Sequence, residues 1–373
     1  PAPGALAVDG RELPASGIGR YLRERLAAWC AAPPFERLVL LGDPAAREAW
    51  LPERAAPVEV VPHAGGFYGP AAQRSWLRAR RHPAVLGAVA AFFPHWDAPL
   101  RAMPARSVVT VHDLIPFRVP GAFPAAKRAL ARPALARVLR TAARVVCVSE
   151  ASAADVRAWA PRAAARVVAI PNGVSPAFAD GPAGPLPPGV AAPFLLCVGN
   201  QKPHKNLAAA VAVLARLRAS GHPALRLVVA GREFAAGGVR ELAQAAGVGD
   251  AVVAPGEVDD ATLRGLYAAC GALLFPSRYE GFGLPVLEAM AAGAPVVASD
   301  PPAVAEVAGD AAPLFAPDDV AGMAAACDRL LVDPAARRAA VERGGARAGG
   351  FRWEETARRT ARVLRQVAAS PRP

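Results

Sequence analysis

Two glutamates that flank a glycine-rich turn are the first residues whose types and spacing could do chemistry. Glu280 and Glu288 are separated by seven residues in the stretch "EGFGLPVLE". Carboxylates placed in this way can accept hydrogen bonds from the hydroxyl groups of a sugar. The glycines between them allow a close backbone approach, and Pro285 suits the first position of a helix whose unpaired N–H groups can hold a phosphate. The alternative for Glu280 alone is a solvated side chain, and the alternative for Glu288 alone is a carboxylate that complements the dipole at the start of the helix.

A second candidate is the basic loop "GNQKPHKN", which begins at Gly199. The chain has 3 lysines and 40 arginines, and two of the lysines, Lys202 and Lys205, lie in this loop. Lysine is a compact, mobile point charge, which suits a diphosphate at a strand-to-helix turn. A solvated basic loop is the alternative, but arginine would serve that purpose equally well in this chain. A helix over 206–217 should follow, with Asn206 as its N-cap.

Two further motifs carry weaker signals. The stretch "VTVHDLIPF" places His112 at the carboxyl end of a predicted strand, although a lone histidine after a strand is more often structural. The stretch "SGIGRY" contains Gly17 and Gly19 but lacks the third glycine of a complete dinucleotide-binding fingerprint. No obvious acidic residue ends the next predicted strand, "RLVLLGD", at the distance that a ribose-binding acid requires, and Asp43 is the nearest candidate.

Composition limits the possible partners and the compartment. The net charge of +12 suits an anionic partner such as a nucleotide, although an arginine-rich solvated surface would give the same value. No basic run is interleaved with aromatic residues, which argues against nucleic acid. The five scattered cysteines are typical of core residues in a reducing compartment. We see neither a signal peptide nor a spanning apolar run, so we expect a cytoplasmic protein, with contact at a membrane surface left open.

The elements that must position these motifs follow an alternating pattern. Short β-branched runs such as "SVVTVHD" (107–113) and "FLLCVG" (194–199) are separated by longer Ala-, Leu- and Arg-rich segments. Continuous apolar runs between helical segments indicate parallel strands that are buried on both faces. In such sheets, ligands bind at the carboxyl ends of the strands, where the glycine-marked turns fall.

A segment rich in Pro and Gly divides the sequence into two similar halves. We predict an N-terminal Rossmann-like domain over 1–180, a linker over 181–193 and a C-terminal Rossmann-like domain over 194–352. A helix over 353–373 should close the chain and return to the first domain. The predicted fold class is therefore α/β, with two doubly wound domains that face each other across a cleft.

Taken together, these motifs resemble the retaining glycosyltransferases of the GT-B fold, in the family numbered four. The resemblance covers nearly the whole chain, from "SGIGRYLRERL" through "VVTVHDLIPFRVP" and "FLLCVGNQKPHKNL" to "FPSRYEGFGLPVLEAMAAGAPVVASD". Its most specific element is the E-x7-E motif of that family, which falls on Glu280 and Glu288. The resemblance implies the GT-B fold and a nucleotide-sugar donor bound by the C-terminal domain.

The resemblance also implies roles for individual residues. Glu280 corresponds to the acid that contacts the donor sugar, and Glu288 to the acid that holds the ribose. Lys205 corresponds to the cation that binds the diphosphate, with Lys202 and His204 near it. The backbone N–H groups of Gly281, Phe282 and Gly283 would meet the sugar and phosphate, and His112 corresponds to the family's histidine over the donor sugar. Gly17 and Gly19 would approach the phosphate and acceptor. The remaining donor-binding candidates are Asn200, Arg232, Val258, Ser277 and Leu284.

This chain departs from the family at one point. Many members carry an arginine directly after the glycine that ends the strand, or an Arg-Lys pair before the asparagine. Here those positions hold Asn200 and His204-Lys205. Part of the usual cationic clamp is therefore absent, or is supplied by Lys202.

The resemblance implies the transfer of a hexose with retention at the anomeric carbon and without a metal or other cofactor. The motifs "HDLIPF" and "PHW" favour GDP-mannose as the donor, with a UDP-sugar as the alternative. The acceptor would be a glycan or a lipid-linked saccharide in polysaccharide biosynthesis. The distant alternatives are an NAD-dependent oxidoreductase and a nucleotide-sugar-binding protein without catalytic activity.

A basic segment suggests a possible membrane partner. The stretch 125–145 carries arginines and Lys127 among apolar residues, and it could lie on an anionic lipid surface at the inner face of a membrane. A solvated pair of helices broken near Pro133 is the alternative.

Overall fold

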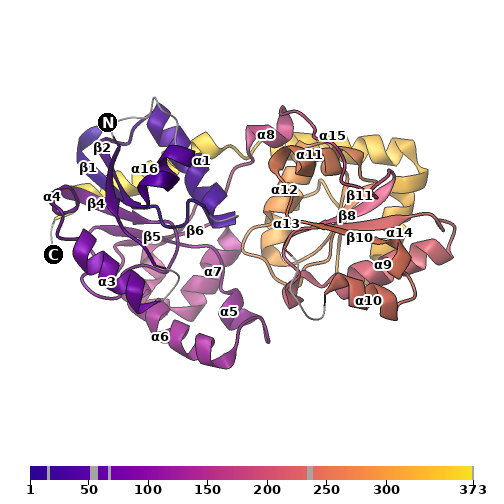
Figure 1. Cartoon of the computed structure of the whole chain (residues 1–373), viewed down its shortest axis with the longest axis horizontal. Coiled ribbons are helices and arrows are strands. Elements are labelled where there is room, and N and C mark those ends of the chain that lie inside the picture. Colours follow the sequence, from indigo (N-terminus) through magenta and orange to yellow (C-terminus); the bar gives the residue numbers. More distant parts are fainter. Residues whose placement is uncertain (15–16, 51–57, 66–68, 233–237, 372–373) are drawn as a thin grey trace. The chain divides into compact units, whose positions relative to one another are not determined.

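The computed structural model of the chain describes residues 1–14, 17–50, 58–65, 69–232 and 238–371. These residues form two compact units (Figure 1). The N-terminal unit consists of Pro1–Arg118, Phe123–Gly173 and Arg352–Pro373, and the C-terminal unit consists of Val119–Ala122 and Val174–Phe351. None of the described helices is long and apolar enough to cross a lipid bilayer.

The N-terminal unit is built on a seven-stranded parallel sheet with the order β3-β2-β1-β4-β5-β6-β7. The strands are β1 (Ala2–Asp9), β2 (Phe35–Gly42), β3 (Val58–Pro62), β4 (Ala88–Phe93), β5 (Ser107–Val111), β6 (Arg144–Cys147) and β7 (Val167–Ala169). The helices are α1 (Gly17–Ala31), α2 (Pro44–Trp50), α3 (Pro70–Ala79), α4 (Pro83–Leu86), α5 (Ile115–Arg118), α6 (Ala125–Thr141), α7 (Glu150–Trp159), the 3₁₀ turn η1 (Pro161–Arg166) and α16 (Trp353–Ala369).

Adjacent residues on a strand face opposite sides of this sheet, and both sides are covered by helices. On β4, Phe93 packs against Trp76 of α3, with ring centroids 5.8 Å apart. Its neighbour Phe92 packs against Trp29 of α1, with centroids 5.5 Å apart. Because successive side chains point to opposite faces, an apolar run such as "AVAAFF" can be buried on both. This is the pattern that the sequence predicted for parallel strands.

The C-terminal unit repeats this design with a six-stranded parallel sheet in the order β10-β9-β8-β11-β12-β13. The strands are β8 (Phe194–Val198), β9 (Arg226–Ala230), β10 (Val252–Gly256), β11 (Ala272–Phe275), β12 (Val296–Ser299) and β13 (Leu314–Phe315). The helices are α8 (Pro176–Ala179), α9 (Leu207–Ala219), α10 (Val239–Ala245), α11 (Asp260–Ala269), α12 (Leu284–Ala291), α13 (Pro302–Ala308), α14 (Val320–Val332) and α15 (Pro334–Ala348), with 3₁₀ turns η2 (Pro203–Lys205) and η3 (Gly249–Ala251). The α/β fold class with two doubly wound units is confirmed.

The division between the units differs from the predicted one. Residues 174–193 were expected to end the first domain and form a linker, but they belong to the second unit. Phe178 packs against Tyr267 of α11 with ring centroids 5.9 Å apart, and the N–H of Gly184 donates to the carbonyl of Ala261 at 2.7 Å. The Pro- and Gly-rich segment that was predicted to be a linker is therefore packed against the second unit. Glycine is needed at position 184 because the backbone lies too close to α11 for a side chain.

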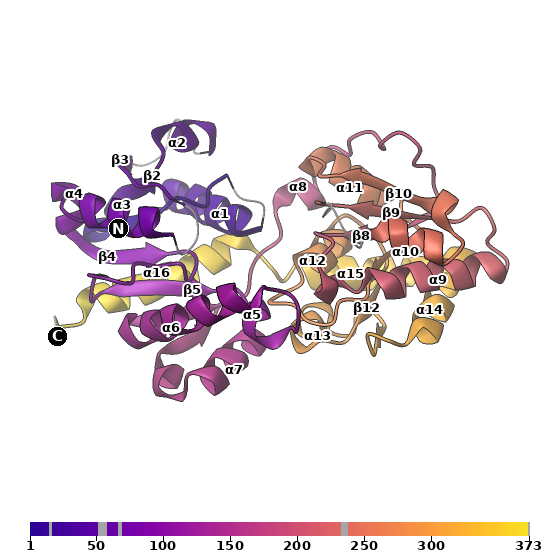
Figure 2. The same cartoon turned by 60° about the horizontal axis from the view of Figure 1, so that its bottom comes forward.

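The last helix of the chain belongs to the first unit. α16, shown in yellow in Figure 2, packs on α1 and on strands β4, β5 and β6. The indole Nε1 of Trp29 donates to the carbonyl of Ala357 at 3.1 Å, and Leu364 is fully buried. The N-terminal unit is therefore completed by residues that follow the whole C-terminal unit in sequence.

Candidate functional site

The carboxyl ends of four neighbouring strands in the C-terminal unit carry most of the predicted donor-binding residues. Asn200 and Lys205 follow β8, Arg232 follows β9, Val258 follows β10, and the glycine-rich turn follows β11. These strands are adjacent in the order β10-β9-β8-β11, and all run parallel. Parallel strands expose their following loops at the same edge, so residues far apart in sequence meet there.

An ion pair between Lys205 and Glu280 lies at the centre of this edge. The Lys205 Nζ is 2.7 Å from Glu280 Oε1, and the two side chains are 13% and 10% exposed. The Nζ also lies 5.0 Å from the ring centroid of Phe275. A side chain at Gly199, where φ is +132°, would bring its Cβ to 3.1 Å from the Lys205 Cε. Glycine at this position therefore leaves room for the lysine beside the end of β8.

Asn206 holds this arrangement in place. It adopts the left-handed conformation with φ 54° and ψ 45°. Its Nδ2 donates to the carbonyl of Pro276 at 3.1 Å and to that of Pro317 at 2.8 Å, while its Oδ1 accepts from Arg278 Nη2 at 3.2 Å. Asn206 occupies the N-cap position of α9 as expected, but its side chain makes no capping hydrogen bond and joins three loops instead.

His204 is buried and contributes no positive charge. Only 3% of it is exposed, and burial lowers its pKa to about 4. Its carbonyl accepts a hydrogen bond from the N–H of Arg278 at 2.7 Å. The imidazole is therefore neutral near pH 7, and the cations of this loop are the two lysines.

Four buried polar atoms near the ion pair have no hydrogen-bond partner among the described residues. They are Asn200 Oδ1, Gln201 Nε2, His204 Nδ1 and Ser277 Oγ. A cavity of about 10 Å³, enough to hold roughly one water, is lined by Asn200, Lys205 and Ser277 among others. Buried polar groups are normally paired, so these four atoms can form hydrogen bonds to a water or to a polar ligand. Gln201 was not among the predicted site residues, although its place inside "GNQKPHKN" was a usable signal.

The glycine-rich turn begins α12 as predicted. The helix starts at Leu284, and Gly283 precedes it with φ +112°, a conformation that favours glycine. The side chain of Phe282 is only 4% exposed and packs edge-on against Phe351 at 6.1 Å. Phe282 can therefore meet a ligand through its backbone, as can Gly281 beside it.

Glu288 lies one turn further along α12 and is 5% exposed. Its Oε2 accepts a hydrogen bond from the hydroxyl of Tyr267 on α11 at 3.1 Å. The buried hydroxyl of Tyr267 thus fixes the orientation of the Glu288 carboxylate.

The remaining predicted donor-binding residues lie in the loops after β8, β9 and β10. Lys202 is half-buried, and Arg232 is exposed, with its carbonyl accepting a hydrogen bond from the N–H of Gln201 at 3.2 Å. Val258 is half-buried, just before α11.

His112 follows β5 in the N-terminal unit. Its Nε2 donates to the carbonyl of Pro94 at 2.8 Å, which leaves Nδ1 as the lone-pair nitrogen. Burial lowers the pKa of His112 to about 4, so the ring is uncharged near pH 7. The ring meets Tyr21 edge-on at 4.6 Å and lies nearly parallel to His95 at 6.1 Å.

Gly17 and Gly19 both lie in the first turn of α1, and the serine before them is outside the described residues. A Cβ at Gly19 would lie 2.7 Å from the carbonyl oxygen of Glu12 and 2.8 Å from that of Leu13. Close packing against this loop therefore already requires glycine at position 19. Gly17 faces open space, where a Cβ would meet nothing within 4 Å.

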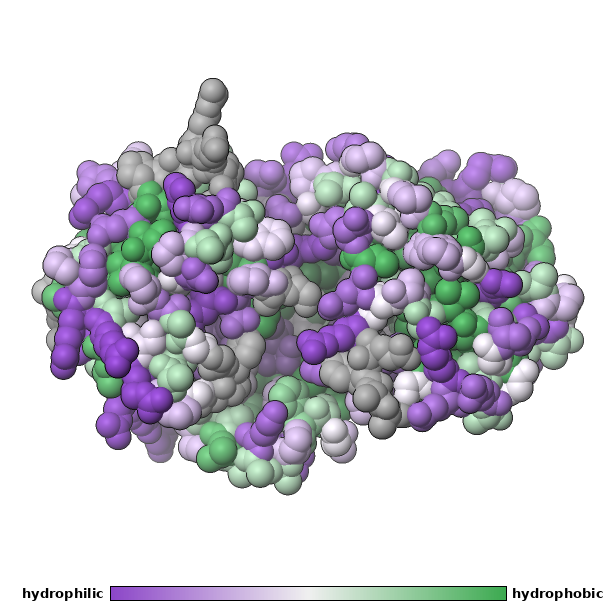
Figure 3. All heavy atoms as spheres, viewed as in Figure 1, coloured by the Kyte–Doolittle hydropathy of each residue, from purple (hydrophilic) through white to green (hydrophobic). Residues whose placement is uncertain are grey.

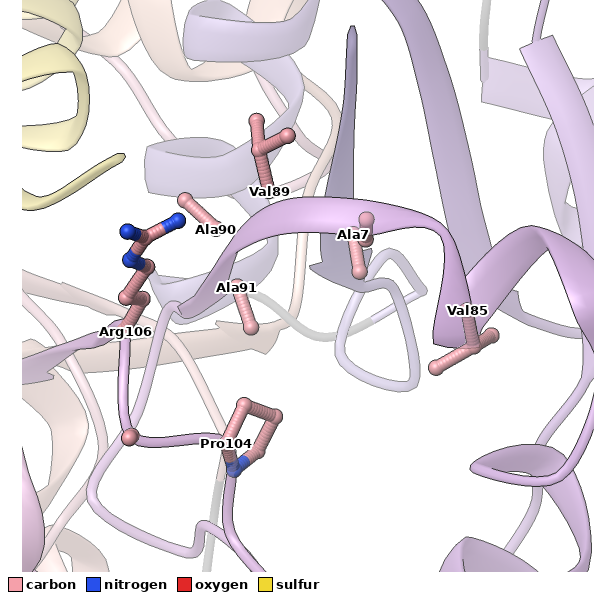
Figure 4. Close-up of a pocket in the computed structure, with 9 residues that line it drawn as sticks. Ala7, Val85, Val89, Ala90, Ala91, Pro104 and Arg106 are labelled. Atoms are coloured by element: carbon pink, nitrogen blue, oxygen red, sulfur yellow. The ribbon is translucent and has the colours of Figure 1, made fainter. Parts of the chain in front are cut away.

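A cavity of about 260 Å³ lies elsewhere in the N-terminal unit (Figure 4). Its lining includes Val85, Ala88, Ala91, Pro104 and Arg106. These residues lie near the amino-terminal ends of β4 and β5, opposite the edge that carries His112, so we assign the cavity no part in the site. Within the described ranges, no group of three or more His, Cys, Asp or Glu side chains could hold a metal ion.

Two family models together match most of the chain. The model described as Glycosyltransferase Family 4 matches residues 15–178, and the model described as Glycosyl transferases group 1 matches residues 187–347. The boundary between them falls within the packed segment that precedes β8. Lys205 and Glu280 lie within the second match, and His112 lies within the first.

Relatives and solved structures agree with these matches. The chain is 45% identical over 105 residues to O-antigen chain mannosyltransferase B of Escherichia coli, covering 28% of each chain. It is 31% identical over 237 residues to the MMP alpha-(1->4)-mannosyltransferase of Mycolicibacterium hassiacum, covering 62% of this chain and 56% of the relative. The chain thus spans about a quarter to about half of the length of these relatives. The solved sucrose-phosphate synthase of Thermosynechococcus elongatus aligns with a TM-score of 0.75 and 23% identity, covering 99% of this chain and 100% of that one.

Proposed function

Because the chain belongs to the family 4 glycosyltransferases of the GT-B fold, we propose that it transfers a hexose from a nucleotide sugar to a glycan or lipid-linked saccharide. The observation that carries this proposal is the Lys205–Glu280 pair, set among unpartnered polar atoms at the carboxyl edge of the sheet. A cation and a carboxylate within 2.7 Å of each other match a ligand in which a diphosphate adjoins a hydroxyl-rich sugar.

The diphosphate is the part of the donor that needs positive charge as the bond to the sugar breaks. Lys205 supplies a partly buried ammonium, and Lys202 lies in the same loop. The N-terminus of α12 adds backbone N–H groups and the positive end of the helix dipole. Fixed charges of this kind in a site with little water stabilise the charge that develops on a leaving group.

The sugar is the part that needs hydrogen-bond partners. Glu280 can accept from its hydroxyl groups, and Asn200 and Ser277 offer further unpartnered polar atoms nearby. The Asn200 and Ser277 atoms are buried and have no partner among the described residues, so pairing with a ligand removes a desolvation cost of about 1–3 kcal/mol for each of these two atoms. This difference favours a polyhydroxylated ligand over an apolar one.

Within this reaction class we propose mannose from GDP-mannose as the transferred sugar, with a UDP-sugar as the alternative. The mannosyltransferase names of both relatives support mannose. We also propose retention at the anomeric carbon without a metal cofactor. The bond between the anomeric carbon and the phosphate oxygen breaks, the acceptor oxygen bonds to the same face, and the leaving phosphate takes the acceptor proton.

Ligand-induced stabilisation tests the donor class directly. A thermal-shift panel of GDP, UDP, ADP, NAD and free mannose should show stabilisation by one nucleoside diphosphate, worth about 2.7 kcal/mol at a hundredfold excess over Kd. Stabilisation by NAD alone would indicate an oxidoreductase and would overturn the proposal. Turnover of the matching nucleotide sugar in the presence of EDTA tests metal independence, and anomeric proton NMR of the product tests retention.

We further propose that α6 meets an anionic membrane surface that presents the acceptor. The amino-terminal part of α6 is exposed on all sides and carries Lys127, Arg128, Leu130 and Arg132, with Leu130 75% exposed. In Figure 3, purple and green spheres lie side by side at the bottom of the view, where Figure 1 places α6. Basic side chains beside an exposed leucine suit anionic lipid.

Sedimentation with liposomes tests the membrane contact. Vesicles that contain anionic lipid should pull down the protein at low salt, and vesicles of neutral lipid should not. Leu130→Glu combined with Arg128→Glu should abolish the sedimentation without a change in melting temperature, because neither side chain is buried. Equal recovery with both kinds of vesicle, or with neither, would contradict the proposal and leave a water-soluble acceptor as the better expectation.

A further inference from the structure

Arg25 of α1 is a wholly buried arginine that forms no ion pair with any described carboxylate. Its exposure is 0%. Nη1 donates to the carbonyl of Tyr21 at 3.2 Å, Nε reaches Thr360 Oγ1 at 3.4 Å, and Nη2 has no partner among the described residues. Burial lowers the pKa of Arg25 to about 10, so the group keeps its charge near pH 7.

Besides these two hydrogen bonds, aromatic rings compensate for the buried charge. The guanidinium lies 3.4 Å from the ring centroid of Tyr21 and 5.5 Å from that of Trp353 on α16. A desolvated cation over an aromatic face gains about 2 kcal/mol or more. The effective cost of burying a charge is several kcal/mol, and apolar replacements of buried charges are often neutral or stabilising. Stability of the fold therefore does not by itself account for an arginine at this position.

Tyr21 connects this charge to His112. Its hydroxyl is 2.7 Å from Thr110 Oγ1 on β5, which fixes the ring at the end of that strand. The same ring meets His112 edge-on at 4.6 Å. Tyr21 and Arg25 are four residues apart, so they stand on one face of α1. A continuous contact path thus runs from Trp353 and Arg25 through Tyr21 to His112.

The imidazole of His112 is surrounded by neutral groups and one charged group. Pro94 accepts from Nε2, His95 lies parallel to the ring, and Ser152 Oγ donates to the His112 carbonyl at 3.0 Å. His95 also has a pKa well below its ordinary value because it is buried. Arg25 is the charged group among these neighbours, and its field adds to burial in lowering the pKa of His112.

We propose that Arg25, acting through the ring of Tyr21, is a positioning residue that sets the orientation and the proton placement of His112. The buried guanidinium disfavours a second positive charge on the imidazole, and the fixed tyrosine ring holds the imidazole against Pro94. A neutral ring with its proton on Nε2 then presents the lone pair of Nδ1. This inference rests on the proposed function only in assigning His112 to the reaction.

The direct test is Arg25→Met in the full chain, read by NMR of histidines labelled with 13C at Cε1. The protein has six histidines, and His112→Gln identifies the His112 signal. The pKa of His112 should rise by about one unit in the variant, because a nearby like charge is removed. The melting temperature should stay level or increase. Arg365→Met is the matched control, because Arg365 on α16 donates to the carbonyl of Pro34 and makes none of these contacts.

Two tyrosine variants extend the test in case Arg25→Met does not fold. Tyr21→Phe keeps the ring and should leave the His112 titration close to wild type, whereas Tyr21→Leu should move it. An unchanged His112 titration in Arg25→Met, or in Tyr21→Leu, would overturn the proposal. In a glycosyltransferase assay, Arg25→Met should lower kcat roughly tenfold while the KM for the donor changes less.

The two sets of measurements separate the two proposals. The NMR titration needs no substrate, so a shifted His112 in a protein without glycosyl transfer would refute the proposed function and leave the positioning role intact. Full turnover in Arg25→Met, despite a shifted titration, would refute the positioning role alone.

Discussion

Lys205 and Glu280 neutralise each other while no donor is bound. Their 2.7 Å contact is mostly shielded from solvent, so each side chain would leave the other buried without a partner if it were replaced. A donor that offers both a diphosphate and sugar hydroxyls can replace both halves of this pair at once. Under the proposed function, binding of the phosphate and binding of the sugar are therefore coupled through one ion pair.

This coupling predicts different losses for the two charges. Lys205→Met should weaken the binding of a free nucleoside diphosphate, because it removes the cation that faces the phosphates. Glu280→Gln should leave that binding intact, since it releases the lysine, but should weaken the binding of the complete nucleotide sugar. Each variant should lower kcat about 100-fold or more. Isothermal titration with both ligands distinguishes the roles.

The control for these variants is Arg216→Met, which removes an exposed cation from α9 of the same unit. It should bind both ligands like the wild type. Diphosphate affinity that is equal in Lys205→Met and in the wild type would remove Lys205 from the phosphate site.

At the scale of elements, the site depends on loops that connect strands to helices. Asn206 ties the loop before α9 to the loops that follow β11 and β13, through Pro276 and Pro317. Its left-handed backbone explains why asparagine suits the position, since asparagine tolerates this conformation better than most residues. The loop that carries Lys205 and the loop that carries Glu280 are thus held by one side chain.

Variants of Asn206 should separate the backbone effect from the side-chain effect. Asn206→Gly keeps the left-handed backbone but loses the amide bonds, at about 1 kcal/mol each. Asn206→Ala loses the same bonds and adds about 1–2 kcal/mol of backbone strain. Urea denaturation should therefore rank wild type above glycine and glycine above alanine, and both variants should bind the donor more weakly. Equal stability of the two variants would contradict a left-handed Asn206.

At the scale of the whole molecule, the N-terminal unit depends on the last helix of the chain. α16 buries eight residues against this unit, including Trp353, Ala357 and Leu364. Burial of a large apolar side chain is worth about 1.5–3 kcal/mol, while a domain has a net stability of about 5–15 kcal/mol. Loss of the helix should therefore remove most or all of the stability of this unit.

Truncation after Phe351 tests this dependence. Hydrogen exchange should show lost protection in β4, β5 and β6, which α16 covers, and retained protection in β8, β9 and β11. A control that ends at residue 370 keeps the whole of α16 and should exchange like the full chain. Normal protection of the N-terminal strands in the protein that ends at Phe351 would show that the unit folds without its final helix.

Much of this protein could be predicted from local sequence. Alternating apolar runs and helical segments specify two parallel sheets, because a strand buried on both faces must be apolar along its length. The glycine-rich turn before α12 and the two lysines after β8 are also visible in the local sequence, because glycine and lysine have properties that suit a phosphate-binding turn. These features depend on neighbours within a few positions in the chain.

The tertiary structure decided what depends on distant residues. Only the fold places Lys205 against Glu280, turns the side chain of Phe282 into the core and packs the Pro- and Gly-rich segment on α11. It also shows that Gly19 is required by the loop at Glu12 and Leu13, and that Arg25 of α1 is a buried cation that contacts α16. Burial, ion pairing and side-chain contacts depend on groups that are far apart in the sequence, and a local sequence pattern does not specify which of these groups come together.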